Sequence, residues 1–139
     1  MKNYVKKAGD RTEFPTRERC FIRELANIGD ISRFSIAECR VAPGVTTELH
    51  SLSVDEWYVM LRGTGMVEVN HCEPVKVSPG DVVEIPAGTA QRITNHDTED
   101  LLFLGVCLPR FTPDAYLSLI HISEPTRRTP ISYAVFCLK

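Results

Sequence analysis

The chain lacks a long hydrophobic run and lacks an excess of basic residues. No apolar stretch reaches the roughly 18 residues that a membrane-spanning helix needs, and the basic start at residues 1–7 is not followed by the apolar core of a secretory signal. Its 16 basic and 18 acidic residues leave a formal net charge of −2, which argues against nucleic acid as a partner. We therefore expect a cytoplasmic protein that binds neither membrane nor nucleic acid.

Several catalytic and metal-binding motifs are also missing. The five cysteines form no C-x-x-C pair, so neither a zinc ribbon nor a dithiol redox motif is predicted, and we expect reduced thiols. There is no G-x-x-x-x-G-K phosphate loop and no nucleophile elbow. A chain of 139 residues with 43% hydrophobic and 24% charged residues is typical of one soluble globular domain.

What the chain does contain is a succession of short strand-like runs. Gly, Pro, Asn and Asp turns recur at short intervals, and the runs between them are rich in Val, Ile, Phe and Tyr. This spacing predicts an all-β sandwich or barrel rather than βαβ units. The predicted strands are 20–25, 31–41, 46–52, 56–61, 65–69, 74–77, 81–85, 91–95 and 101–108. Only residues 113–116 could begin a helix.

Strand alternation suggests which side chains share a face. Residues two apart in a strand point the same way, so Glu48, His50 and Leu52 share one face. If the strands are neighbours in a barrel, His50, Glu56 and Gln91 could converge on its interior. Alternation alone permits this convergence, and a single histidine on a strand is more often a structural, hydrogen-bonded residue.

Two spacing patterns in the sequence include these residues and favour a functional role for them. The first reads G-x5-H-x5-E-x6-G from Gly44 to Gly63, and the second reads G-x5-P-x-G-x2-Q-x3-N from Gly80 to Asn95. Together they resemble the two signature motifs of the cupin superfamily, over about residues 18–113. More narrowly, the chain resembles small single-domain cupins loosely labelled mannose-6-phosphate-isomerase-like. The resemblance implies a cupin-type jelly-roll β-barrel, often a homodimer.

The same resemblance implies a metal site with departures. The family's three His and one Glu would fall on His50, Leu52, Glu56 and Gln91. Leu52 cannot bind a metal, and Gln91 offers only a weak neutral carbonyl oxygen. We expect a reduced site of His50, Glu56 and Gln91 that holds Mn, Fe, Ni, Zn or Cu weakly or not at all. The alternative is an empty polar pocket in which His50 and Glu56 hydrogen-bond each other.

Further residues complete the predicted pocket. Glu48 lies two residues before His50 and could act as a catalytic general base or as an extra oxygen ligand. Alternatively, it hydrogen-bonds Arg62 or Arg92 or faces water. The predicted pocket walls are Leu52, Tyr58, Met60, Ile93 and Phe103.

Three classes of function follow, and the sequence leaves open whether the protein is an enzyme. The first is a metal-dependent isomerase, epimerase, lyase or dioxygenase that acts on a small molecule. The second is a binding or sensor module that holds a small ligand without metal or chemistry. The third is a structural cupin with a closed core.

The last stretch of the chain does not resemble the rest. Residues 117–139 read LSLIHISEPTRRTPISYAVFCLK, which resembles the translation of a sequencing-library adapter. We therefore expect a gene assembled from bacterial metagenomic reads, with a native C-terminus that this segment has replaced. The expected organisation is a flexible arm over 1–17, a cupin barrel over 18–116 and a non-native tail over 117–139.

Overall fold

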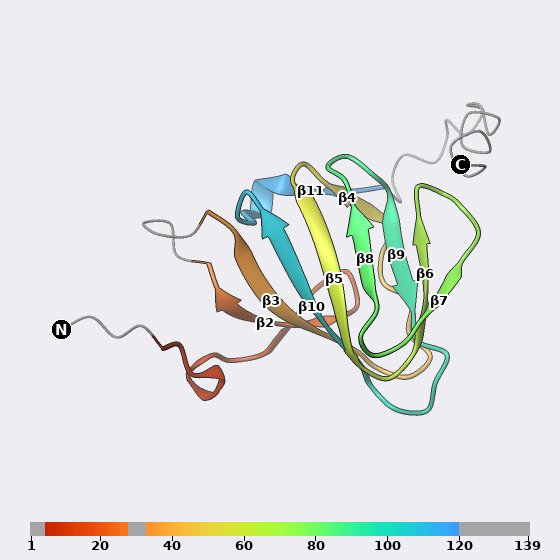
Figure 1. The fold of residues 1–139 in the computed structure, drawn as a ribbon, viewed down its shortest axis with the longest axis horizontal. Helices are drawn as coiled ribbons and strands as arrows, with labels where there is room; N and C mark the ends of the chain where they lie inside the picture. Colours follow the sequence, from red (N-terminus) through yellow and green to blue (C-terminus); the bar gives the residue numbers. More distant parts are fainter. Residues whose placement is uncertain (1–4, 28–32, 120–139) are drawn as a thin grey trace.

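Two antiparallel β-sheets face each other in the computed structural model, which describes residues 5–27 and 33–119 (Figure 1). The strands are β1 (Phe14–Pro15), β2 (Phe21–Ala26), β3 (Ser35–Val41), β4 (His50–Leu52), β5 (Asp55–Arg62), β6 (Gly65–Val69), β7 (Val75–Val77), β8 (Val82–Ile85), β9 (Gln91–Thr94), β10 (Leu101–Leu108) and β11 (Tyr116–Ser118). Two single-turn 3₁₀ helices, η1 (Ala8–Asp10) and η2 (Pro113–Ala115), complete the described structure.

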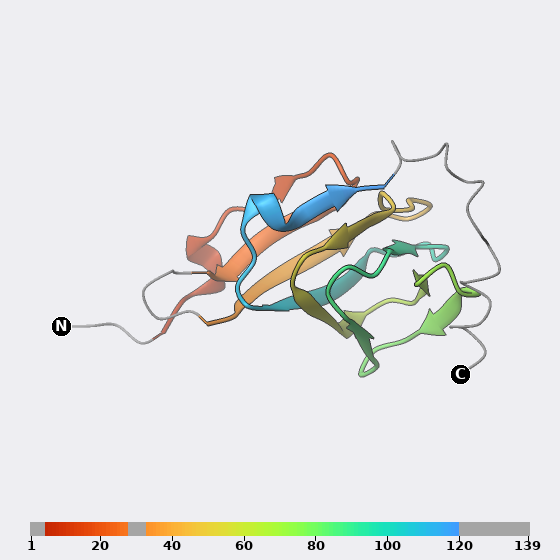
Figure 2. The ribbon, with the colours of Figure 1, turned by 90° about the horizontal axis from the view of Figure 1, so that it is seen from above.

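The order of the strands is that of a jelly roll. One sheet runs β1-β2-β3-β10-β5-β8 and the other runs β11-β4-β9-β6-β7, so neighbouring strands are often distant in sequence. Figure 2 shows the two layers from above. The predicted all-β barrel fold is confirmed. No helix in the described part of the chain is long and apolar enough to cross a membrane.

The strand β10 organises the larger sheet because it pairs with β3 on one side and β5 on the other. Its burial alternates strictly, with Leu101, Phe103, Gly105 and Cys107 buried and the residues between them partly exposed. Side chains two apart share a face, so this alternation directs one face of β10 into the space between the sheets.

A glycine permits the tight connection from β5 to β6. Gly63 has a φ of +79°, and a Cβ at this position would lie 2.7 Å from the carbonyl oxygen of Asp100. Any other residue would meet both a strained backbone and a clash with backbone atoms. The motif glycine at this position is therefore explained by conformation and space.

The main hydrophobic core lies between the two sheets, away from β4 and β11. Met60, Ile93, Leu101 and Val41 are each exposed by no more than 1%. The full cluster comprises Cys20, Cys39, Val41, Tyr58, Met60, Val67, Val77, Val83, Ile85, Ile93, Leu101 and Phe103.

A buried asparagine closes one end of this core. The Asn95 side-chain amide donates to the carbonyl oxygens of Val41 at 2.9 Å and Glu99 at 2.8 Å, and its oxygen accepts the backbone N–H of Asp97 at 2.8 Å. Asn95 is fully buried, so these bonds satisfy polar groups that would otherwise be costly. The last residue of the second motif is thus a structural residue.

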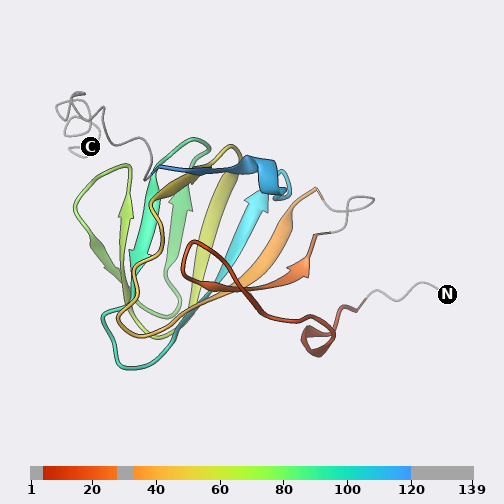
Figure 3. The same ribbon diagram turned by 180° about the vertical axis from the view of Figure 1, so that it is seen from behind.

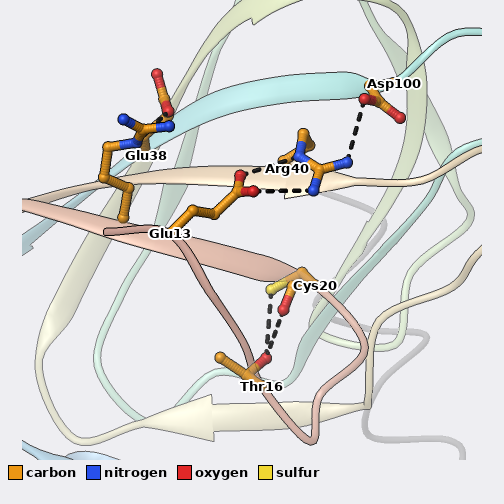
Figure 4. A network of polar contacts seen from close by, with 7 residues as sticks. Glu13, Thr16, Cys20, Glu38, Arg40 and Asp100 are labelled. Atoms are coloured by element: carbon orange, nitrogen blue, oxygen red, sulfur yellow. Dashed lines mark hydrogen bonds and ion pairs between the residues drawn. The ribbon is translucent and has the colours of Figure 1, made fainter. Parts of the chain in front are cut away.

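The N-terminal segment is fastened to the larger sheet, as Figure 4 shows. The Arg40 guanidinium contacts the Glu13 carboxylate at 2.9 Å and the Asp100 carboxylate at 3.2 Å. The Thr16 hydroxyl donates to the carbonyl oxygen of Cys20 at 2.9 Å. The segment predicted as a flexible arm over 1–17 therefore includes β1 and ion-paired residues; residues 1–4 lie outside the described range.

The predicted strands match the observed ones with a few differences. Residues 101–108 and 65–69 have the predicted bounds, whereas the strand predicted over 46–52 is only β4, His50–Leu52. Thr46 instead forms an isolated bridge with Thr94. The predicted helix start at 113–116 is the short η2.

The first residues of the adapter-like segment belong to a strand. In β11, Leu117 pairs with Ser51 and Ser118 pairs with His50 on β4, and the Leu119 N–H donates to the Leu49 carbonyl oxygen at 2.9 Å. Residues 120–139 lie outside the described range, and so do His121 and Cys137.

Candidate functional site

A cavity of about 150 Å³ lies between the larger sheet and the strands β4 and β11. The segment before β2 lines one side, and Figure 3 shows it running below β4 and β11. Two contacts attach this segment there: the Arg19 Nε–H donates to the Thr46 carbonyl oxygen at 2.8 Å, and the Glu48 N–H donates to the Glu18 carbonyl oxygen at 3.0 Å. The lining residues used below are Phe14, Thr16, Glu18, Glu24, Cys39, His50, Leu52, Glu56, Tyr58, Phe103, Gly105, Cys107, Phe111 and Tyr116.

A hydrogen-bond chain crosses the interior from one sheet to the other. Gln91 on β9 is fully buried, and its Nε2–H donates to the Glu56 carboxylate on β5 at 2.9 Å. The Gln91 carbonyl oxygen accepts the hydroxyl of Tyr58. The amide thus turns its nitrogen toward Glu56, where it donates, and its oxygen toward Tyr58, where it accepts. The chain Tyr58–Gln91–Glu56 therefore uses both ends of the amide.

The Glu56 carboxyl lies in a poorly solvated position. Burial raises its pKa to about 7, against a smaller lowering by the Gln91 hydrogen bond and a further rise from the charge of Glu18. Its other oxygen packs against the β10 backbone, where a Cβ on Gly105 would lie 3.1 Å from it. The carboxyl group therefore exists in both protonated and ionised forms near neutral pH.

His50 faces Gln91 across the pairing of β4 with β9. Its Nδ1 lies 2.7 Å from the carbonyl oxygen of Glu48, and a carbonyl oxygen only accepts, so Nδ1 carries the proton. In the neutral ring Nε2 then has a free lone pair, and no hydrogen bond to it is formed by the described residues. The imidazole is 4% exposed and stacks on Tyr116 with ring centroids 4.7 Å apart.

Glu48 is buried but does not line the cavity. Its carboxylate accepts the Tyr116 hydroxyl at 2.5 Å. Burial acts to raise the pKa of Glu48, but the hydrogen bond from Tyr116 acts together with further lowering contributions, including the positive charge of Arg17, and the net pKa is lowered. The predicted alternative partner Arg92 pairs with Glu68 at 3.0 Å.

Two cysteine thiols, Cys39 and Cys107, also line the cavity. Burial raises the pKa of Cys39 well above its ordinary value and that of Cys107 to about 12. A thiol that stays protonated is a poor nucleophile and a poor metal ligand. These side chains therefore act as small apolar wall groups.

Comparison with known proteins identifies the family. The model of the cupin domain matches residues 37–107, which is just over half of the chain and includes both motifs. The chain belongs to the cupin family.

Solved structures share this cupin fold. The polyketide cyclase RemF from Streptomyces resistomycificus is 22% identical and superposes with a TM-score of 0.72, over 96% of this chain and 97% of its own. Pac13 from Streptomyces, described as a nucleoside dehydratase and solved with uridine, is 14% identical with a TM-score of 0.70, over 85% of this chain and 91% of its own. A sucrose-binding protein of Glycine max is 43% identical over 42 residues, which span 30% of this cupin and 8% of the soybean protein.

The donor set does not fit the divalent ion that the family implies. The oxygen of Gln91, which would be the third ligand, accepts the Tyr58 hydroxyl, and its N–H groups cannot bind a cation. Leu52 occupies the position of another histidine. Only His50 Nε2 and the Glu56 carboxylate remain, and the described residues contain no group of three His, Cys, Asp or Glu side chains placed to hold a metal. A hydrogen bond between His50 and Glu56, the predicted alternative, is likewise not formed among the described residues.

The structure separates the predicted pocket walls into two groups. Leu52, Tyr58 and Phe103 line the cavity, the last two also as members of the main core, while Met60 and Ile93 lie in the main core and do not line the cavity. Gln91 lies behind the cavity wall, between Tyr58 and Glu56.

Sequence reasoning missed several residues of the site. Glu18 lies in the loop between β1 and β2, and Tyr116 begins β11, so both lie outside the two cupin motifs. Gly105 lies within a strand, where an interior glycine signals close packing. That glycine is the one sequence signal that could have pointed to Glu56 as its neighbour.

Proposed function

We propose that this cupin is an enzyme that uses general acid–base chemistry on a small polar molecule, as an isomerase, epimerase or lyase. One observation carries the proposal. The Glu56 carboxyl is held by the amide of Gln91 at 2.9 Å, with His50 lining the same cavity. A carboxyl group in this setting serves proton transfer better than metal binding, because the amide that holds it has no free oxygen to share with a cation.

Two groups take the roles of base and acid. The lone pair on His50 Nε2 accepts a proton from a substrate carbon next to a carbonyl group, and the protonated Glu56 carboxyl donates a proton to a substrate oxygen. In a lyase reaction the C–H electron pair forms the new double bond, the C–O bond breaks, and the hydroxyl leaves as water with the proton from Glu56. In an isomerase the C–H electron pair forms a carbon–carbon double bond and the carbonyl oxygen takes the proton from Glu56, which gives an enediol. His50 then returns its proton to the neighbouring carbon, and the second enediol hydroxyl gives its proton back to Glu56 as the new carbonyl group forms.

Glu48 has an indirect part in this scheme. Its carboxylate accepts the Tyr116 hydroxyl, and the Tyr116 ring stacks on His50. We assign Glu48 as a positioning residue that holds Tyr116 against the imidazole, instead of the catalytic base that its sequence position suggested.

The comparisons support a small-molecule ligand. Uridine in the Pac13 structure and sucrose in the name of the soybean protein are both uncharged ring molecules with several hydroxyl groups. A cavity of about 150 Å³ takes a ring of this kind or the reacting part of a larger molecule. Location in the cytoplasm and assembly as a homodimer stay predictions.

Activity screening of metal-stripped protein tests the proposal. We expect turnover of a hydroxy-carbonyl substrate in excess EDTA, with kcat reduced about 10²-fold or more in both His50→Ala and Glu56→Gln. The matched control Glu84→Gln removes an exposed carboxylate on β8, outside the cavity, and should leave kcat unchanged. Turnover that survives both cavity substitutions contradicts the assignment.

Two alternatives are decided by related measurements. A divalent ion on His50 and Glu56 requires metal in protein purified without chelator, and its loss in His50→Ala and Glu56→Ala, by elemental analysis. A binding module, which the mostly apolar cavity walls favour, requires saturable ligand binding with no product formed. Both measurements use the full chain.

A further inference from the structure

The cavity has an unusual balance of charge. The acidic residues Glu18, Glu24 and Glu56 line it, and no Lys or Arg does so among the residues that the structure describes. Arg17 lies nearby and acts electrostatically on Glu48 and Tyr116, but it is exposed and is not part of the wall. A negatively charged ligand would therefore enter a region that contains only negative or neutral side chains.

The hydrogen-bonding groups of the wall also disfavour an anion, because acceptors are more available than donors. The hydroxyls of Thr16, Tyr58 and Tyr116 donate to the Cys20 carbonyl oxygen, the Gln91 oxygen and the Glu48 carboxylate, so these donors are directed to protein acceptors. Acceptors remain in the wall: the lone pair of His50 Nε2 and the carboxylate oxygens. A ligand that brings hydroxyl donors is satisfied here, whereas an oxyanion would face acceptors.

Flat rings form part of the remaining wall. The Tyr58 and Phe103 rings lie 4.4 Å apart at 39°, and Tyr116 stacks with His50. Phe14 and Phe111 line the cavity as well. Ring faces of this kind, around about 150 Å³, suit a cyclic ligand about the size of one six-membered ring.

From charge, hydrogen bonding and shape we propose that this cavity admits uncharged, hydroxyl-bearing ring molecules and rejects anions, including phosphorylated and carboxylated ones. The proposal rests on the proposed function only in using the same cavity, and it names the class of substrate. A phosphorylated sugar, the substrate that the mannose-6-phosphate-isomerase-like label suggests, would therefore not bind in this cavity.

Phenol and benzoate test the proposal because they share one ring and differ in charge. With full-length protein at pH 8, titrations followed by NMR signals of His50 and its neighbours should show phenol binding at least about tenfold tighter than benzoate. Glu18→Gln should narrow this ratio several-fold by strengthening benzoate binding. Glu84→Gln makes the same change of charge outside the cavity and should leave the ratio unchanged.

Any of three other results would contradict the proposal. Benzoate binding as tightly as phenol, or a ratio that Glu18→Gln leaves unaltered in a folded variant, would show that the acidic wall does not select the ligand. No binding of either probe would show that the cavity does not admit an uncharged ring of this size. These titrations measure binding without turnover. A failure to find catalysis would therefore not contradict the binding result. If the binding prediction fails, the acid–base roles of His50 and Glu56 are still tested separately by kinetics.

Discussion

At the scale of single residues, the site depends on how one amide is oriented. Gln91 stands where the metal-binding members of the family place a histidine, and it joins Tyr58 to Glu56. An amide supplies a donor and an acceptor at once, so it can hold a carboxyl group and a phenol together, which a metal-bound imidazole cannot do. The change from His to Gln therefore changes the chemistry that Glu56 can perform.

Restoring histidines should restore metal binding. Gln91→His and Leu52→His together would give three imidazoles and the Glu56 carboxylate, the donor set of metal-binding cupins. We expect near-stoichiometric uptake of Ni²⁺, Mn²⁺ or Zn²⁺ by the double variant and much less by the parent chain. Elemental analysis after desalting measures this, with thermal unfolding as a check that the variant is folded. Equal uptake by parent and variant would contradict our reading of the donor set.

The raised pKa of Glu56 predicts how stability changes with pH. Its folded-state pKa of about 7 lies above the ordinary value of 4.5, so its favourable contribution is fully present below about pH 4.5 and is lost as pH rises through 7. Glu56→Gln should remove this decline, which is worth about 1–3 kcal/mol. Denaturant unfolding at pH 4.5, 6 and 8 measures it. An unchanged pH slope in the variant would show that Glu56 is ordinarily solvated.

At the scale of elements, β10 determines how closely Glu56 can approach the larger sheet. The strand is central, pairing with β3 and β5, and its Gly105 leaves room for the carboxyl group. Cys39 on β3 lies on the same side, where a Cβ on Gly105 would be 3.6 Å from its sulfur. The position of the acid is therefore a property of three adjacent strands.

Gly105→Ala tests this packing. The added methyl group would lie 3.1 Å from the Glu56 carboxylate, so we expect a loss of about 1–2 kcal/mol in the free energy of unfolding. In the background of Glu56→Ala the same substitution should cost distinctly less, because the clash is removed. Denaturant unfolding of the four chains gives the coupling energy. If Gly105→Ala lowers the free energy of unfolding equally in both backgrounds, the destabilisation does not come from a clash with Glu56.

At the scale of the whole molecule, β11 closes the cavity side of the smaller sheet. It begins with Tyr116, which stacks on His50, and continues with Leu117 and Ser118 on β4. The latter two residues come from the adapter-like segment. Main-chain pairing needs little specific side-chain chemistry, so such a segment can extend an available strand edge whatever its origin.

Truncation tests the prediction that residues 117–139 are a non-native tail. Ending the chain after Tyr116, compared with ending it after Leu119, removes the pairing of Leu117 and Ser118 and the Leu119–Leu49 bond. We expect a difference of about 1 kcal/mol in the free energy of unfolding, because exposed main-chain bonds contribute little each. A difference above about 2 kcal/mol would indicate that 117–119 are native residues.

The sequence by itself determined the fold and the strand pattern. Local periodicity and turn glycines predict the strands, and the two spaced motifs point to His50, Glu56 and Gln91 as interior residues; such signals act over a few residues or at regular spacing. Only the tertiary structure decided which way Gln91 turns, that Met60 and Ile93 belong to the core, that Glu48 lies behind Tyr116, and that Glu18 reaches the cavity. These facts depend on contacts between strands far apart in the chain, and no spacing within one segment encodes which atoms meet across two sheets.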